Sequence, residues 1–222
     1  MHQQAFARLS RFARHLQQAV ALAALAAGII VNPALAQTTS SSAPKELRIG
    51  YQKYGTLVIL KARGTLEKRL AGQGVDVKWT EFPFGPPLLE AINVGSIDVG
   101  TVGESPPIFA QAAGADLIYV GNEPPAPAAE AIIVPKDSPI KNVAELKGKR
   151  VAVAKGSNAN YLLIKLLERA GLKFGDIEVI YLPPADARAA FESGRVDAWS
   201  IWDPFLAASE KQLGARVLAD GK

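Results

Sequence analysis

Two glycine–hydroxyl pairs, Gly55-Thr56 and Gly156-Ser157, stand where an expected strand turns into an expected helix. The first N–H groups of a helix have no partner within the helix and lie at the positive end of its dipole. Small or hydroxyl residues at such a place can therefore bind an anion without a cationic side chain. The same residue types are also ordinary helix caps, so the sequence leaves both interpretations open.

Further candidate residues follow because ligands of parallel α/β sheets bind beyond the carboxyl ends of the strands. Trp202 ends an expected strand and is the aromatic residue best placed to line an alkyl or aryl tail of a ligand. A carboxylate would repel a bound anion, so we expect Glu104 to cap the helix that follows it or to bind water. Asp203, which precedes Pro204, likewise resembles a helix cap.

Residue types that many enzymes need are missing. The chain has no cysteine, and its 2 histidines, His2 and His15, fall within the first 36 residues. Serine–histidine and cysteine–histidine catalysis and His/Cys zinc sites are therefore excluded for the remainder of the chain. The phosphate-binding patterns G-x-x-x-x-G-K-[ST] and G-x-G-x-x-G are absent as well. We expect no enzyme activity, no catalytic residue, no metal site and no cofactor.

Residues 1–36 have the pattern of a secretory signal peptide. Three arginines without an acidic residue precede an apolar run from Ala19 to Val31, and Ala34-Leu35-Ala36 follows. The run is shorter than the roughly 20 residues of a membrane-spanning helix. We therefore expect cleavage after Ala36 and export to the periplasm. Without a cysteine near the cleavage point, no lipid anchor is expected.

Cleavage would also change the charge. It would remove three of the 25 basic residues and none of the 21 acidic ones, so the net charge would fall from +4 to +1. That balance gives no reason to expect a nucleic acid as partner. Residues 37–45 are rich in Ser, Thr, Ala and Pro, and we expect them to be a disordered lead-in.

From Glu46 onward, expected strands and helices alternate, which favours parallel sheets covered by helices. Apolar runs predict strands over 46–51, 75–82, 97–102, 117–120, 131–135, 150–154, 177–181, 196–201 and 215–218. Helices are expected over 56–70 with an interruption at Gly64, and over 87–94, 106–113, 159–170, 185–193 and 204–213.

The chain also repeats a short pattern. Asn93–Val99 and Glu192–Ala198 both run from a helix end through a glycine and one residue to an aspartate between apolar residues. We therefore predict two α/β lobes, lobe one over residues 46–127 and lobe two over residues 128–222. The proline-rich segment Glu123–Pro127, which is unsuited to helix and poor as strand, is predicted to cross between them.

Several of these segments resemble the aliphatic sulfonate-binding proteins of ABC importers. The matching strings are Leu47–Leu57, Asn93–Glu104, Asn122–Pro127, Lys155–Asn158, Tyr181–Phe191 and Ile201–Phe205. The resemblance implies a two-lobed type II periplasmic binding protein of the α/β class that closes over a small organic anion, an alkanesulfonate. It also implies a membrane permease as partner, and we expect a monomer. The family's binding region falls on Gln52, Gly55, Thr56, Leu57, Gly103, Glu104, Ser157, Asn158 and Trp202.

The resemblance also predicts an incomplete chain. In this fold the chain normally crosses back to complete lobe one, whereas this sequence stops at Lys222, after the last expected strand of lobe two. We therefore expect a fragment that is truncated before the C-terminal part of lobe one. Apolar surface would then be exposed on lobe one.

Other functions are open from the sequence. The same role could serve taurine, nitrate or another small anion, because backbone amides that hold one oxyanion hold others. An enzyme on the same fold, such as a dehydratase or a pyrimidine-precursor synthase, is opposed by the missing histidine and cysteine and by the export signal. The effector lobe of a transcription regulator would need an N-terminal helix-turn-helix, and the export signal stands in its place.

Overall fold

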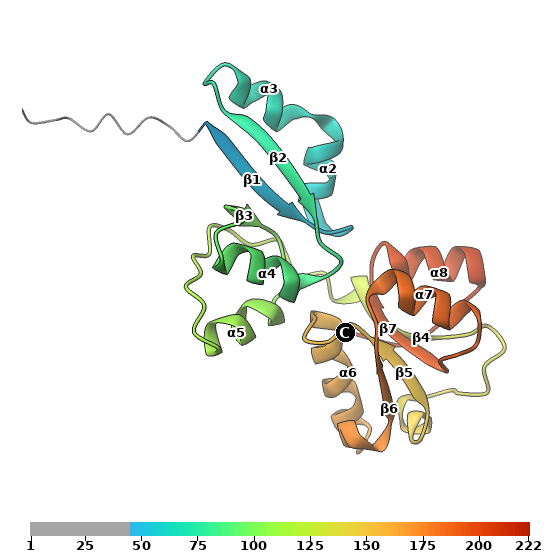
Figure 1. The fold of residues 1–222 in the computed structure, drawn as a ribbon. Coiled ribbons are helices and arrows are strands. Elements are labelled where there is room, and N and C mark those ends of the chain that lie inside the picture. Colours follow the sequence, from blue (N-terminus) through green and yellow to red (C-terminus); the bar gives the residue numbers. More distant parts are fainter. Residues whose placement is uncertain (1–44) are drawn as a thin grey trace, which may run out of the picture. The chain divides into compact units, whose positions relative to one another are not determined.

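The computed structural model describes residues 45–222, so the predicted signal peptide and nearly all of the predicted lead-in lie outside the described residues. The first sheet has the strand order β2-β1-β3 with parallel pairing throughout (Figure 1). Its strands are β1 (Glu46–Tyr51), β2 (Asp76–Glu81) and the two-residue β3 (Val99–Gly100). The expected strands over 46–51 and 75–82 are confirmed, whereas the one over 97–102 is much shorter than predicted.

Helices fill the connections of the first sheet. α2 (Gly55–Arg63) and α3 (Thr65–Ala71) lie between β1 and β2, and α4 (Gly85–Asn93) lies between β2 and β3. α5 (Ser105–Ala112) follows β3. Gly64 adopts a left-handed conformation with φ of 61° and ends α2, which is the predicted interruption of the helical pattern.

Leu88 of α4 is the point at which this helix packs on the sheet. Its side chain is fully buried, and it lies over two glycines of neighbouring strands, Gly50 and Gly100. A Cβ atom on Gly100 would lie 2.6 Å from a methyl carbon of Leu88. The glycines therefore allow the helix to approach the strands as closely as it does.

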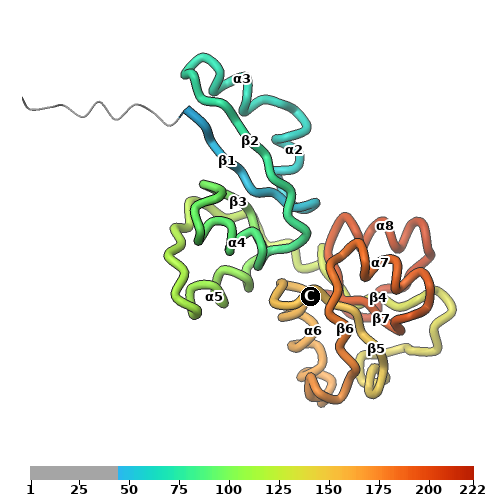
Figure 2. Tube along the Cα trace, viewed as in Figure 1, coloured from blue at the N-terminus to red at the C-terminus, as the bar shows by residue number. Residues whose placement is uncertain are grey.

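The predicted strand over 117–120 is wrong. The chain from the end of α5 to Ala126 has no regular secondary structure, as Figure 2 shows for the stretch before β4. Ile118 and Val120 in this segment are 86% and 82% exposed. Val94 after α4 and Ile108 of α5 are 70% and 61% exposed. A β-branched run has strand propensity, but it forms a strand only where a neighbouring strand pairs with it, and none does here. Apolar side chains are thus exposed on this part of the chain.

The second sheet has the order β6-β5-β7-β4-β8. Its strands are β4 (Glu130–Val134), β5 (Arg150–Val153), β6 (Glu178–Tyr181), β7 (Ala198–Trp202) and β8 (Arg216–Asp220). β5 pairs in parallel with β6 and β7, but β4 runs antiparallel to β7 and β8. The expected parallel pairing therefore holds for β5 with β6 and β7 but is wrong for β4, because a buried apolar run does not encode its direction.

The helices of the second sheet are α6 (Asn158–Arg169), α7 (Pro184–Glu192) and α8 (Phe205–Leu213), and short 3-10 turns span Pro127–Ala129, Val143–Leu146 and Phe174–Asp176. Two adjacent residues of β7 show how the helices are divided between the faces. Ser200 donates its hydroxyl to the Ala159 carbonyl of α6 at 2.8 Å. The Trp199 ring instead lies 6.0 Å from the Phe191 ring of α7 and 6.2 Å from the Phe205 ring of α8. Since neighbouring strand residues point to opposite faces, α6 covers one face and α7 and α8 the other.

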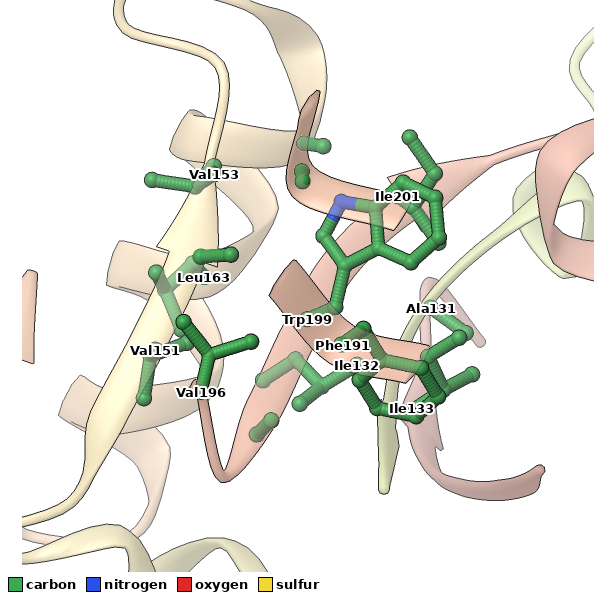
Figure 3. Packing of buried hydrophobic residues seen from close by; sticks show 14 of the residues in the cluster. Ala131, Ile132, Ile133, Val151, Val153, Leu163, Phe191, Val196, Trp199 and Ile201 are labelled. Atoms are coloured by element: carbon green, nitrogen blue, oxygen red, sulfur yellow. The ribbon is translucent and has the colours of Figure 1, made fainter. Parts of the chain in front are cut away.

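The hydrophobic core of the second sheet combines β4, β5 and β7 with these helices (Figure 3). Trp199 is completely buried at its centre. Four leucines at helical spacing share one face of α6 and are all buried: Leu162, Leu163, Leu166 and Leu167. The first sheet and the second sheet thus fall within 46–127 and 128–222, and the lobe boundary itself stays a prediction.

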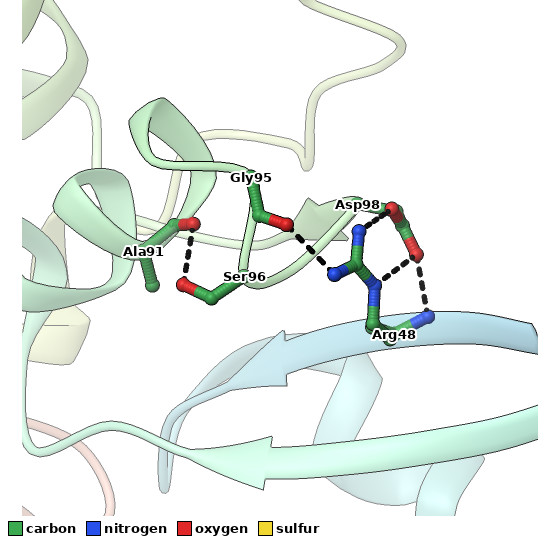
Figure 4. A network of polar contacts seen from close by, with 5 residues as sticks. All are labelled: Arg48, Ala91, Gly95, Ser96 and Asp98. Atoms are coloured by element: carbon green, nitrogen blue, oxygen red, sulfur yellow. Dashed lines mark hydrogen bonds and ion pairs between the residues drawn. The ribbon is translucent and has the colours of Figure 1, made fainter.

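The predicted sequence repeat corresponds to a repeated ion pair. Asp98, which precedes β3, accepts hydrogen bonds from the backbone N–H and the guanidinium of Arg48, and Arg48 also donates to the Gly95 carbonyl (Figure 4). Asp197, which precedes β7, accepts the same three bonds from Arg150, and Arg150 donates to the Gly194 carbonyl. The two halves of the chain share this local structure.

Candidate functional site

The N-terminus of α2 is built by the turn that follows β1. Gly55 has a positive φ of 71°, and Tyr54 before it makes no side-chain cap. The backbone N–H of Thr56, in the first turn of α2, donates to Oε1 of Glu123 at 3.0 Å, and the Thr56 hydroxyl donates to the same oxygen at 2.8 Å. The predicted anion-binding end of this helix therefore carries a carboxylate.

Gln52 and Leu57 flank this turn. Gln52 is buried, and its amide donates to the Thr101 carbonyl at 3.0 Å, which ties the end of β1 to the end of β3. Its donor is thus engaged within the protein. Leu57 is partly buried on α2. Of Gln52, Thr56 and Leu57, it is Thr56 that donates hydrogen bonds to a carboxylate.

Gly103 and Glu104 lie between β3 and α5. Gly103 is buried, and a Cβ atom there would lie 2.7 Å from Cγ and Oδ1 of Asn158, so this contact requires glycine. Glu104 stands at the N-cap position of α5 but makes no side-chain cap. Its carboxylate accepts the Ser105 hydroxyl at 3.0 Å instead. Of the two predicted roles of Glu104, the helix cap is therefore wrong, because the carboxylate turns to the neighbouring hydroxyl, and water binding stays a prediction.

Ser157 and Asn158 open α6. The Ser157 side chain is 1% exposed, accepts the N–H of Asn160 at 3.2 Å and donates to the Ala154 carbonyl at 2.7 Å. Ser157 thus acts as the helix cap that was the alternative interpretation of this residue. The Asn158 amide donates to Glu130. Asn158 is therefore placed beside both Gly103 and a half-buried carboxylate.

Glu130 is a residue that the sequence analysis missed. It begins β4, directly opposite Trp202 in the antiparallel register with β7. Burial raises the pKa of Glu130 to about 7, the negative charge of Glu104 adds to the rise, and the Asn158 hydrogen bond opposes it. An acidic residue at the start of an otherwise apolar strand was the available signal.

Three carboxylates influence the pKa of Tyr54. Its pKa is raised first by burial and then by the charges of Glu123, Glu104 and Glu130. Of the predicted set, the structure thus places Thr56 against Glu123, and Gly103 against Asn158, whose amide contacts Glu130. The hollows beside Phe191 and beside Arg169 are lined by none of the predicted site residues.

Trp202 and Asp203 end β7. Trp202 is 4% exposed and belongs to the core of the second sheet, so its role as a wall for a ligand tail stays a prediction. Asp203 accepts the N–H of Ala207 at 3.0 Å, and the predicted cap of the last helix is thereby confirmed.

Across residues 45–222, His, Cys, Asp and Glu form no group of three that could hold a metal ion. Within the same range, no helix is both long enough and apolar enough to span a membrane. The site offers hydrogen-bond donors from a helix N-terminus and acceptors from several carboxylates.

Curated proteins with similar sequences have names that refer to aliphatic sulfonates. A protein of Escherichia coli (strain K12) so named is 58% identical over 183 residues, which are 82% of this chain and 57% of the relative. Its counterpart from Bacillus subtilis (strain 168) is 41% identical over 179 residues, which are 80% of this chain and 54% of the relative. The chain thus spans little more than half the length of these relatives.

Among solved structures, the alkanesulfonate-binding protein SsuA from Xanthomonas axonopodis pv. citri, bound to MOPS, is similar with a TM-score of 0.76 and 54% identity. The match covers 81% of this chain and 62% of that chain. This likeness confirms the predicted α/β fold of a type II periplasmic binding protein. The model of the family described as NMT1/THI5 like matches residues 70–218, which is more than half of the sequence. This chain therefore belongs to the NMT1/THI5-like family.

Proposed function

We propose that this protein is the solute-binding component of an ABC importer and binds an aliphatic sulfonate. The observation that carries the proposal is the pair of donors on Thr56, whose N–H and hydroxyl already hold one carboxylate oxygen at the start of α2. A sulfonate has three acceptor oxygens and stays ionised at physiological pH. The names of the relatives from E. coli and X. axonopodis support this class of ligand.

The energies are adequate for the proposed role. Hydrogen bonds to charged groups contribute about 1.5–3 kcal/mol each. A few such bonds from Thr56 and nearby amides would support micromolar binding, which corresponds to about −8 kcal/mol. Burial of an alkyl tail would add roughly 0.8 kcal/mol for each methylene.

The wider role follows from the same proposal. The ligand binds between lobe one (46–127) and lobe two (128–222), and a membrane permease recognises the closed state. The protein acts in the periplasm as a monomer, after removal of the signal peptide, and has no enzyme activity. The predicted contacts are Gln52, Gly55, Thr56, Leu57, Gly103, Glu104, Ser157, Asn158 and Trp202.

A thermal-shift experiment on the purified protein tests the proposal. The ligands are ethanesulfonate, longer alkanesulfonates, taurine, nitrate and sulfate. A ligand at a hundred times its Kd adds about 2.7 kcal/mol to the free energy of unfolding. We expect the shift to be selective for alkanesulfonates. A well-folded protein that responds only to taurine or nitrate would show that the proposed substrate is wrong, and no response at all would contradict the binding role.

A further inference from the structure

The carboxylate of Glu123 occupies the place at which the sulfonate is proposed to bind. Its Oε1 atom accepts both the N–H and the hydroxyl of Thr56. The same oxygen lies 3.0 Å from the position of a Cβ atom on Gly55, so the carboxylate is seated directly against the turn that opens α2. A sulfonate oxygen could not accept these two hydrogen bonds while Glu123 does.

The contact is not the usual cap supplied by the helix itself. Glu123 is 67 residues from Thr56 in sequence and lies in the irregular segment that leads to β4. α2 has no acidic residue in its first turn, and its N-cap residue Tyr54 makes no side-chain cap. Within residues 45–222, the negative charge on this helix end is thus brought from a separate segment of the chain.

Two anions cannot share these donors at low energy. The charges of Glu123 and Glu104 both raise the pKa of Tyr54, so the surroundings are already negative. A sulfonate added beside Glu123 would repel it and compete for the same N–H and hydroxyl. Because Glu123 is part of the same chain, its effective concentration at the helix end is on the order of millimolar.

We propose that Glu123 is an internal competitor that holds the N-terminus of α2 in the free protein and that a bound sulfonate displaces it. This inference rests on the proposed function, because it concerns the same site. The protein is competent to bind an anion only in the fraction of molecules in which Glu123 has left, so the apparent Kd is raised by the reciprocal of that fraction. Glu123 therefore sets the affinity that any anion must exceed.

Displacement has a distinctive thermodynamic signature. Glu123 must leave before any anion takes the Thr56 donors, so its removal tightens the binding of different anions by the same factor. Butanesulfonate and pentanoate are suitable probes, because both carry one negative charge on a butyl tail. If Glu123 instead interacted directly with one of the two head groups, its removal would change the ratio of the two Kd values.

The test compares Kd values from isothermal titration calorimetry for the full 222-residue protein and three variants. E123Q keeps the side-chain shape and loses the charge, and E123D keeps the charge but shortens the side chain that reaches Thr56. E145Q is the matched control, because Glu145 also accepts a backbone N–H, that of Lys141 at 2.8 Å, but lies in a different part of the chain. We expect E123Q and E123D to lower the Kd of both probes about tenfold and by the same factor, and E145Q to leave both unchanged.

The alternatives give different results. If Glu123 only caps α2, E123Q lowers the unfolding temperature without tightening either probe, and the inference is wrong. If E145Q tightens binding as much as E123Q, a general effect of net charge replaces displacement. A tightening by E123Q but not E123D would also contradict displacement, since the charge alone would then be responsible.

The proposed function can fail separately. A folded wild type that binds neither butanesulfonate nor any other anion of the panel contradicts the proposed function. In that case, binding by E123Q alone would still support displacement, and absence of binding in every variant would contradict the inference as well.

Discussion

Asp197 and Arg150 are joined in the same way as Asp98 and Arg48. In each pair, the aspartate before one strand accepts the backbone N–H of an arginine on the neighbouring strand at 2.8 Å and its Nε at 3.1 Å. The arginine then donates to the carbonyl of the glycine three residues before the aspartate. The pair thus closes the turn between a helix and the next strand in both halves of the chain.

The Asp197 contact predicts a loss of stability in acid. Its hydrogen bonds to the Arg150 side chain hold the pKa of Asp197 below its usual value, although burial opposes this shift. A lowered folded-state pKa contributes stability above the unfolded-state pKa, and that contribution is lost as the pH falls through the folded-state value. We expect D197N to lower the free energy of unfolding by about 1–2 kcal/mol at pH 7, since the pair is partly solvated.

Urea denaturation of D197N and of wild type between pH 7 and pH 2 measures this effect. The two proteins should converge in stability at the acid end, where Asp197 is protonated in the wild type. A difference that stays constant over the whole pH range would show that the ionised carboxylate is not the stabilising form.

The raised pKa of Glu130 predicts a pH dependence of the free energy of unfolding that is opposite in sign to that of Asp197. Its folded-state pKa is about 7, raised first by burial. Between the usual value of 4.5 and about 7, the folded protein therefore binds more protons than the unfolded chain. The free energy of unfolding should fall as the pH rises through this window, by at most about 1.4 kcal/mol per pH unit, and level off above it.

E130Q should remove this slope, because the amide resembles the protonated carboxyl group and can still accept the Asn158 hydrogen bond. Chemical denaturation at pH 4.5, 6, 7 and 8 gives the comparison. E145Q serves as control, since it also removes a carboxylate that accepts a backbone N–H but lies in a different part of the chain. An unchanged slope in E130Q would show that Glu130 does not take up the proton.

Thr56 predicts a coupling with Glu123. T56V removes the hydroxyl that a sulfonate would use, so butanesulfonate binding should weaken, by about tenfold or more for the loss of one charge-assisted hydrogen bond. In the wild type, the same substitution also weakens the hold of Glu123 on the helix end. The loss should therefore be larger in the E123Q background, and a double-mutant cycle by calorimetry measures the difference.

T56S is the matched control, because it keeps the hydroxyl and should bind nearly as the wild type does. Equal losses from T56V with and without Glu123 would show that the two residues are not coupled through the ligand site. An unchanged Kd in T56V would remove Thr56 from the site.

The close approach of Leu88 to Gly100 predicts a loss of stability on substitution that does not depend on any ligand. In G100A, the new methyl group would meet the Leu88 side chain at 2.6 Å, so α4 must shift away from the sheet. We expect a loss of about 1–3 kcal/mol, the usual range for overpacking a core. G72A is the control: Gly72 at the end of α3 has φ of −64° and no atom near its Cβ position. Thermal unfolding should show G72A unchanged or slightly more stable, and equal effects in the two variants would contradict this account.

The sequence determined the features that depend on neighbouring residues. The helices α2 to α8 and the left-handed glycine after α2 follow from periodicity and from glycine's conformational freedom. The repeated glycine–aspartate pattern was visible as well, although its arginine partners were not. Each of these predictions needed only residues within a turn or two of one another.

The tertiary structure alone decided the features that join distant segments. It placed Glu123 on Thr56, set Arg48 and Arg150 against their aspartates, and reversed the direction of β4. It also left residues 117–120 without a strand partner, so their apolar pattern formed no strand. Hydrogen-bond partners, strand direction and the raised pKa of Glu130 depend on which segments meet in space, and local periodicity carries no information about that.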